Sequence, residues 1–245
     1  MSEQQSSLLV ADSFRVRMNQ ITGQAEVRGW HKHLNRFRKG VHDACPELDQ
    51  SVVEAFLAEA ARAIQDYGEG FPRLELWQET NQTPWLSFSL RPLPVLTTEL
   101  ELRTAAGVVL ENPTRKGPNI ACLTALNHRL GAEALLADPS GCVIEGATTS
   151  LIWWDTVSQR GHVVQSTNNR VASVTEQLLA NEVALTPSRI PPGSLTGHEV
   201  WALNALHGIR VVTAIDSIPT QKPNTRRLEI YTDALNRYWQ PVLAA

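Results

Sequence analysis

The chain has 245 residues, a length that suits one large domain or two of modest size. Its composition, 42% hydrophobic and 19% charged, is that of an ordinary globular protein and excludes disordered, collagenous and disulfide-scaffold classes. The 22 Lys and Arg residues against 25 Asp and Glu give a net charge of -3, so no basic field attracts nucleic acid or anionic membrane. We therefore expect small-molecule partners and no nucleic acid.

The cysteines and the hydropathy pattern exclude further classes. Cys45, Cys122 and Cys142 show no CxxC spacing and no histidine cluster beside them, which predicts neither a disulfide framework nor a metal site. We expect these cysteines to be small buried hydrophobic residues. No segment approaches the roughly 18 apolar residues of a membrane span, and the start MSEQQSSLLV lacks the pattern of a signal peptide. The expected location is the cytoplasm, with no membrane partner.

The first half of the chain predicts an α+β unit. Apolar and polar residues alternate over 13–24 and end in a glycine turn, which indicates a strand hairpin. Apolar residues recur at helical spacing over 30–41 and 49–67, the second segment beginning near Asp49 or Ser51. Two further strands are expected over 73–77 and 85–90.

A Pro- and Gly-punctuated stretch over 93–117 has no helical period, and we expect the domain boundary near its end. This predicts an N-terminal α+β domain over 1–112, linker included, and a C-terminal domain over 113–245. In the second domain we expect helices over 119–130, 173–181 and 225–238, with strands that include 132–138, 199–204 and 209–215. Trp153 and Trp154 alternate along another strand, so we expect one in the core and one at an interface.

Five segments carry a family resemblance: HLNRF at 33–37, KGPN at 116–119, GAEALLADPSGCVIEGATTSLIWW at 131–154, SVTEQLL at 173–179 and WALNALHGIRVV at 201–212. Taken in this order, they resemble the fold-type IV pyridoxal-phosphate enzymes, the class IV aminotransferase family that includes aminodeoxychorismate lyase. The resemblance implies a two-domain α+β fold with the cofactor pyridoxal 5'-phosphate between the domains and an α/β-barrel-like, cofactor-binding C-terminal domain. It also implies a homodimer and a small amine or amino acid as substrate.

The family requires a lysine that forms a Schiff base with the cofactor and then moves protons at the substrate carbon. The resemblance gives this role to Lys116, at the domain boundary and 29 residues before Glu145, a spacing a few residues shorter than in the family. Lys32 and Lys39 fall in a surface helix and Lys222 in a terminal turn. Without the resemblance, a lysine beside Arg115 in a Pro-rich loop is more typical of a solvated surface residue.

Glu145 resembles the family carboxylate that contacts the pyridine nitrogen of the cofactor. An anion there keeps the ring protonated, so the ring can withdraw electrons from the substrate carbon. Gly146 and the small residues after it leave room for a cofactor. The alternative is a glutamate in an ordinary hairpin turn.

The cofactor phosphate needs a cation and several backbone donors. Arg36 matches the family's phosphate arginine, while Val174 and Thr175 match a helix N-terminus that binds anions. A turn in the position of the second phosphate contact comprises Asn204, Ala205 and Leu206. Arg36 as a solvated helix arginine and Thr175 as a helix cap remain alternatives.

The segment WALNALHGIRVV resembles the lyase more than the aminotransferases, and Ser13 matches a lyase threonine that assists proton transfer. Two departures are the replacement of the usual arginine after Thr175 by Glu176 and the short segment between Lys116 and Glu145. Three hypotheses follow: a lyase that converts 4-amino-4-deoxychorismate to 4-aminobenzoate and pyruvate in folate biosynthesis, a class IV aminotransferase acting on D- or branched-chain amino acids, and a catalytically silent relative that binds the cofactor or a partner protein.

Overall fold

The structure is a computed structural model and describes residues 6–80, 82–165 and 168–243. The described chain forms two compact units. The first contains the residues up to Val95, the segment Arg115–Pro118 and the chain from Tyr238, and the second contains Leu96–Thr114 and Asn119–Arg237. This division differs from the predicted boundary at 112/113. The strand β6 (Glu99–Ala105) pairs with strands of the second unit, whereas β15 (Trp239–Pro241) pairs within the first.

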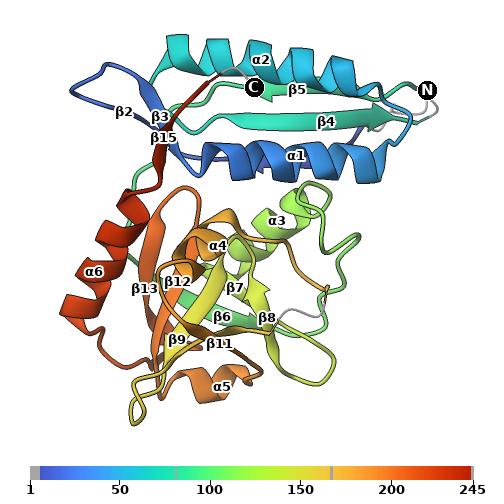
Figure 1. Cartoon of the computed structure of the whole chain (residues 1–245). Helices are drawn as coiled ribbons and strands as arrows, with labels where there is room; N and C mark the ends of the chain where they lie inside the picture. The colour runs from blue at the N-terminus through green and yellow to red at the C-terminus, as the bar shows by residue number, and fades with distance from the viewer. Residues whose placement is uncertain (1–5, 81, 166–167, 244–245) are drawn as a thin grey trace. The chain divides into compact units, whose positions relative to one another are not determined.

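The first unit contains a three-stranded antiparallel sheet in the order β1-β4-β5. Its strands are β1 (Ser6–Ser13), β4 (Arg73–Glu79) and β5 (Trp85–Ser89), and the last two confirm predicted strands. The helices α1 (Trp30–Ala44) and α2 (Gln50–Tyr67) run along this sheet (Figure 1) and confirm the two predicted helices. Asp49 begins α2 because its side chain accepts the Ser51 amide at 2.8 Å.

The two faces of this sheet differ in polarity. Because side chains alternate along a strand, Val10 and Phe88 share one face, which receives Gly40 of α1 and Phe56 of α2. The other face is mixed: it carries Ser13, Arg73, Glu75, Ser87 and Ser89 near one end and Ala11, Trp77 and Trp85 further along. Ser13 and Glu75 are nevertheless buried.

A second small sheet in this unit has the order β15-β3-β2, with β2 (Val16–Met18) and β3 (Ala25–Arg28). The predicted hairpin over 13–24 is therefore shifted, because Ser13 ends β1 and the hairpin joins β2 to β3. The predicted final helix over 225–238 is shorter than expected. It ends at Asn236, and the chain then enters β15.

The second unit is built on a nine-stranded mixed sheet in the order β11-β10-β9-β12-β13-β6-β7-β8, with β14 paired to β13. The edge strand β8 also contacts β9 and β10, so the sheet curls on itself. Besides β6, its strands are β7 (Glu133–Ala137), β8 (Val143–Gly146), β9 (Ser150–Trp154), β10 (Gly161–Val164), β11 (Leu185–Ser188), β12 (Glu199–Asn204), β13 (Gly208–Ile215) and β14 (Ile218–Pro219).

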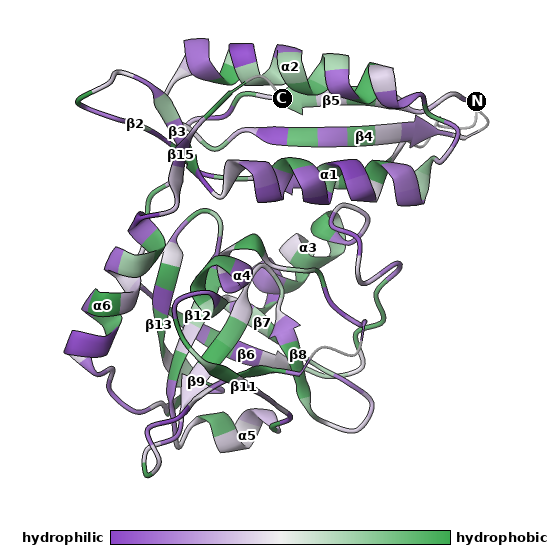
Figure 2. Ribbon diagram, viewed as in Figure 1, coloured by the Kyte–Doolittle hydropathy of each residue, from purple (hydrophilic) through white to green (hydrophobic). Residues whose placement is uncertain are grey.

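Helices cover this sheet, whose strands carry much of the apolar sequence (Figure 2). They are α3 (Ile120–Leu130), α4 (Val174–Ala180), α5 (Pro192–Leu195) and α6 (Thr225–Asn236). Trp153 lies in the core on one face of the sheet and Trp154 in the core on the other, each 3% exposed. The expectation that one of them lies at an interface is therefore wrong, because each face of β9 is covered.

Cys45 is buried, but Cys142 is half-buried and Cys122 is exposed on α3, so the expectation of three buried cysteines is wrong. In the part of the chain that the structure describes, no group of His, Cys, Asp and Glu could hold a metal ion. Within the same residues, no helix is both long and apolar enough to cross a membrane.

Candidate active site

Lys116 belongs to the first unit, where its segment is fixed along β1. The carbonyl oxygen of Lys116 accepts the amide of Ala11 at 2.8 Å. The next residue, Gly117, has φ +144°, and a Cβ there would lie 2.7 Å from Cα of Val10. Only glycine allows this close approach, so the sequence KGPN holds the half-buried Lys116 beside the end of β1.

Beside this segment lies a polar group formed by the buried Asp12 and His33 and the half-buried Arg36. His33 and Arg36 stand three residues apart on α1, so they share one face of the helix and reach β1 together. The Asp12 carboxylate accepts from Arg36 Nε at 2.7 Å and Nη2 at 2.8 Å, and it lies 2.8 Å from His33 Nδ1. Arg36 is thus oriented by a bidentate ion pair, which the sequence did not predict.

Electrostatics tie Lys116 to the same group. Burial by itself raises the pKa of Asp12, but the charges of Arg36 and His33 and their hydrogen bonds outweigh it and hold that pKa well below its usual range. Burial lowers the pKa of His33 more than Asp12 raises it, and the charges of Arg36 and Lys116 lower it further. The structure therefore brings the predicted residues Lys116 and Arg36 into one charged cluster.

Ser13 lies on the mixed face of the sheet and is 7% exposed. Its hydroxyl accepts a hydrogen bond from Arg91 Nη2 at 3.2 Å, so the hydroxyl proton itself is not used in this contact. Arg91 is held by the carbonyl of Phe71 at 3.0 Å and lies over the Phe71 ring, 5.0 Å from its centroid. Burial lowers the pKa of Arg91, as does the charge of Arg73, while Glu75 opposes them.

In the second unit, Glu145 stands in β8, opposite Leu136 of β7. Arg170, 7% exposed, donates to Glu176 from Nη1 and Nη2 at 2.8 Å each. Burial lowers the pKa of Arg170, but the hydrogen bond and charge of Glu176, followed by the charge of Glu145, raise it above its ordinary value. Glu176, which replaces the arginine usual in the family, has its negative charge balanced by Arg170. The charge of Arg170 also lies within electrostatic range of Glu145.

The N-terminus of α4 carries the predicted residues Val174 and Thr175, both buried. Ser173 is the cap of this helix, since its side chain accepts the Glu176 amide at 3.2 Å. The alternative interpretation of Thr175 as the cap is therefore wrong.

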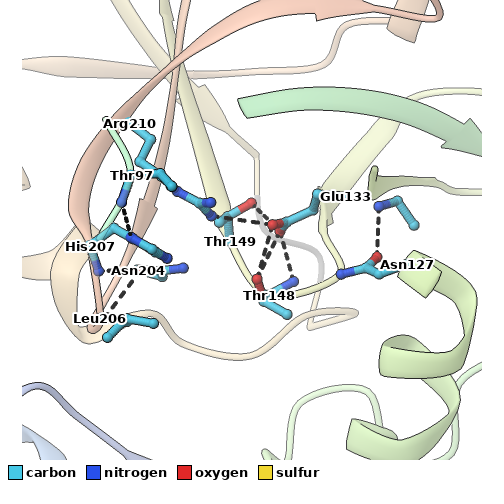
Figure 3. A network of polar contacts seen from close by, with 10 residues as sticks. Thr97, Asn127, Glu133, Thr148, Thr149, Asn204, Leu206, His207 and Arg210 are labelled. Atoms are coloured by element: carbon cyan, nitrogen blue, oxygen red, sulfur yellow. Dashed lines mark hydrogen bonds and ion pairs between the residues drawn. The ribbon is translucent and has the colours of Figure 1, made fainter. Parts of the chain in front are cut away.

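The turn after β12 stabilises itself (Figure 3). Asn204 Oδ1 accepts the amides of Leu206 at 3.2 Å and His207 at 2.9 Å, and His207 Nδ1 accepts the Thr97 amide at 3.2 Å. In this conformation the Leu206 amide is used inside the turn. Asn204 therefore shapes the turn that contains Ala205.

Sequence reasoning missed Asp12, Arg91 and Arg170. The i, i+3 spacing of His33 and Arg36 was a signal that both residues face one partner. The partner itself was not readable, because it comes from a strand more than twenty residues away.

Comparison with known proteins agrees with this architecture. A family model described as amino-transferase class IV matches residues 9–215, most of the chain. Among solved structures, the branched-chain aminotransferase of the archaeon Thermoproteus uzoniensis with norvaline is 15% identical, with a TM-score of 0.77 over 95% of this chain and 89% of that one. The branched-chain aminotransferase of Thermobaculum terrenum in its PLP form is 14% identical, with a TM-score of 0.76 over 95% and 89%. The Escherichia coli enzyme of that name is also 14% identical, with a TM-score of 0.76 over 98% and 91%.

These matches define a two-unit enzyme fold of the pyridoxal-phosphate class. The chain belongs to the amino-transferase class IV family, and it is a pyridoxal-phosphate-dependent enzyme. No curated protein matches it.

The residues present are of the kinds that the cofactor needs. The first unit offers a lysine and an arginine in one charged cluster. The second offers a carboxylate, Glu145, in β8. A lysine, an arginine and a carboxylate are the kinds of group that pyridoxal phosphate requires.

Proposed function

We propose that this enzyme is a lyase that converts 4-amino-4-deoxychorismate to 4-aminobenzoate and pyruvate, with Lys116 as its proton-transfer group and Ser13 assisting. To the phosphate of the cofactor we assign Arg36, Val174, Thr175, Asn204, Ala205 and Leu206. We assign Glu145 to the pyridine nitrogen.

The observation that carries this proposal is the polar environment of Ser13. Around its hydroxyl the sheet carries Arg73, Glu75 and the serines of β5, and Arg91 contacts it directly. Arg73 is paired with Glu75 at 2.7 Å, so Arg91 is the guanidinium that we assign to a substrate carboxylate, because guanidinium groups bind carboxylates well. Aminodeoxychorismate has two carboxylates, whereas a branched-chain amino acid presents a hydrocarbon chain.

When bound, pyridoxal phosphate supplies an electron sink for the carbon that bears the substrate amine. Lys116 Nζ takes the proton from that carbon, and the C–O bond to the enolpyruvyl group then breaks. Return of the proton to the enol carbon gives pyruvate, so the atoms balance without a second substrate. Glu145 would keep the pyridine nitrogen protonated, and the charge of Arg170 lies within electrostatic range of Glu145. Ser13, oriented by Arg91, is able to donate or relay a proton.

A class IV aminotransferase is the second candidate, because the solved structures that share the fold include branched-chain aminotransferases. That reaction passes the amino group to a keto acid and so requires a second substrate.

Substrate assays distinguish these functions. The protein loaded with pyridoxal phosphate is incubated with aminodeoxychorismate without any keto acid, and separately with D- and branched-chain amino acids plus 2-oxoglutarate or pyruvate. We expect 4-aminobenzoate and pyruvate in equal amounts from the first incubation. Transamination alone would establish the second candidate, and cofactor binding without either activity would indicate the silent relative.

A further inference from the structure

A buried carboxylate outside the predicted site joins three parts of the second unit (Figure 3). Glu133, at the start of β7, accepts at Oε1 from the Thr148 amide at 2.9 Å and from Thr149 Oγ1 at 2.7 Å. The Thr148 hydroxyl also lies 3.1 and 3.0 Å from the two carboxylate oxygens. Oε2 lies 3.3 Å from Arg210 Nη2 of β13. The side chain of Glu133 therefore connects β7 to the turn between β8 and β9 and to β13.

The bound turn is the one that directly follows Glu145. Across it, the Gly146 amide donates to the Thr149 carbonyl at 2.8 Å, and the Ala147 amide donates to the Ala134 carbonyl at 2.8 Å. A Cβ at Gly146 would lie 2.8 Å from Glu133 Oε1. The glycine thus makes room for the Glu133 carboxylate, which in turn fixes the backbone next to Glu145.

The cation of the pair is linked to the second predicted phosphate contact. Arg210 lies two residues after Gly208, where β13 leaves the Asn204 turn, and it pairs with Ala202 across the hairpin. Burial lowers the pKa of Arg210 and Glu133 raises it, and both side chains are about nine-tenths buried. Separating a charge pair at this depth is costly, because it leaves a charge without compensation in a site of low polarity.

We infer that Glu133 and Arg210 are positioning residues that set the two turns carrying Glu145 and Asn204–Leu206 in the arrangement required by the cofactor, without touching the cofactor themselves. This inference rests on the proposed roles of those turns. Beyond those roles, it assigns to the Glu133–Arg210 pair the function of holding both turns in place.

The test compares Glu133→Gln with a matched control, Glu199→Gln. Glu199 is equally buried in the same unit and pairs with Arg227, but its partners Arg227 and Asn224 belong to α6 and its cap. Pyridoxal phosphate is titrated into the apoprotein of each variant, and the absorption maximum of the bound cofactor is recorded from pH 5 to 9. Amide hydrogen exchange of the apoproteins is followed over 145–150.

We expect Glu133→Gln to raise the dissociation constant of pyridoxal phosphate by about tenfold or more, as for other residues that orient a binding group. It should also shift the pH midpoint of the cofactor absorption and speed exchange over 145–150. Glu199→Gln should change none of these. Because Glu133→Gln could impair folding, the milder Thr149→Val, which removes one hydroxyl at nearly constant volume, should shift all three readouts in the same direction.

Equal dissociation constants and spectra for the wild type, Glu133→Gln and Thr149→Val would overturn the positioning role while leaving the proposed function intact. Equal losses in Glu133→Gln and Glu199→Gln would overturn it as well, by showing only a general loss of stability. If the wild-type protein itself does not bind pyridoxal phosphate, the proposed function fails, and this inference fails with it.

Discussion

Replacing Asp12 with asparagine tests the cluster beside Lys116. The Asp12 side chain is 1% exposed and holds two nitrogens of Arg36, whose side chain is 17% exposed. The asparagine amide cannot balance the guanidinium charge, so Asp12→Asn leaves Arg36 without a counter-ion in a largely dry site. Removing one partner of a buried ion pair costs about 3–5 kcal/mol of unfolding free energy.

A more exposed pair that joins α1 to α2 provides the control. Arg38 and Glu54 form a bidentate pair of similar geometry, at 2.7 and 2.6 Å, but their side chains are 27% and 35% exposed. Glu54→Gln should therefore cost only about 0–1 kcal/mol. Urea unfolding of the apoproteins at pH 7, followed by circular dichroism, measures both. A loss for Asp12→Asn within about 1 kcal/mol of the loss for Glu54→Gln would refute the reasoning.

The cluster of Asp12, His33 and Arg36 also predicts that the stability of the fold decreases as the pH is lowered. Because the folded-state pKa of Asp12 lies below its unfolded value of about 3.9, its stabilisation is present above that pH and is lost as the pH falls below it. Burial lowers the pKa of His33 below its unfolded value of about 6.5, so its contribution is present in full above that pH and is lost as the pH falls from there through the lower folded-state pKa. The wild type should therefore lose stability on acidification in both ranges, and Asp12→Asn should flatten the lower one. An unchanged slope below pH 4 in the variant would contradict this assignment.

Four further predictions follow from the site. Gly117→Ala should weaken cofactor binding and cost about 1–3 kcal/mol, because the new Cβ meets β1 at 2.7 Å, whereas Gly141→Ala, also at positive φ but in open space, should cost less; equal losses in urea unfolding would contradict this. Glu145→Ala should reduce kcat about 100-fold with either substrate class through loss of charge stabilisation, and a change under threefold would exclude its role at the pyridine nitrogen. Ser13→Ala should slow 4-aminobenzoate formation while Ser13→Thr retains it, and equal rates would remove Ser13 from proton transfer. Sedimentation should show a homodimer, and a fully active monomer at assay dilution would refute that expectation.

The helices were predictable from sequence because their signals are local. Asp49 before α2 and Ser173 before α4 both act as caps, and the apolar spacing of each helix follows the 3.6-residue period. The small sheet of the first unit was not predictable to the same degree. Its strand β15 pairs with β3 from the opposite end of the chain, and no local pattern encodes such a partner.

The candidate site likewise contains residues that local motifs predict and residues that only long-range pairing reveals. Family motifs singled out Lys116, Arg36 and Glu145 individually, but the residues that orient them come from other strands and loops. Neither Asp12 nor Glu133 carries a local sequence signal of its contacts. Their roles depend on long-range pairing, which a single sequence does not specify.

The central claim is that Lys116 carries the cofactor in this class IV enzyme. The protein loaded with pyridoxal phosphate is reduced with borohydride, digested and mapped by mass spectrometry. A phosphopyridoxyl group on the peptide containing Lys116, and on no other lysine, is the predicted result. A label on Lys32, Lys39 or Lys222, or no label on a protein that has bound the cofactor, would contradict the account.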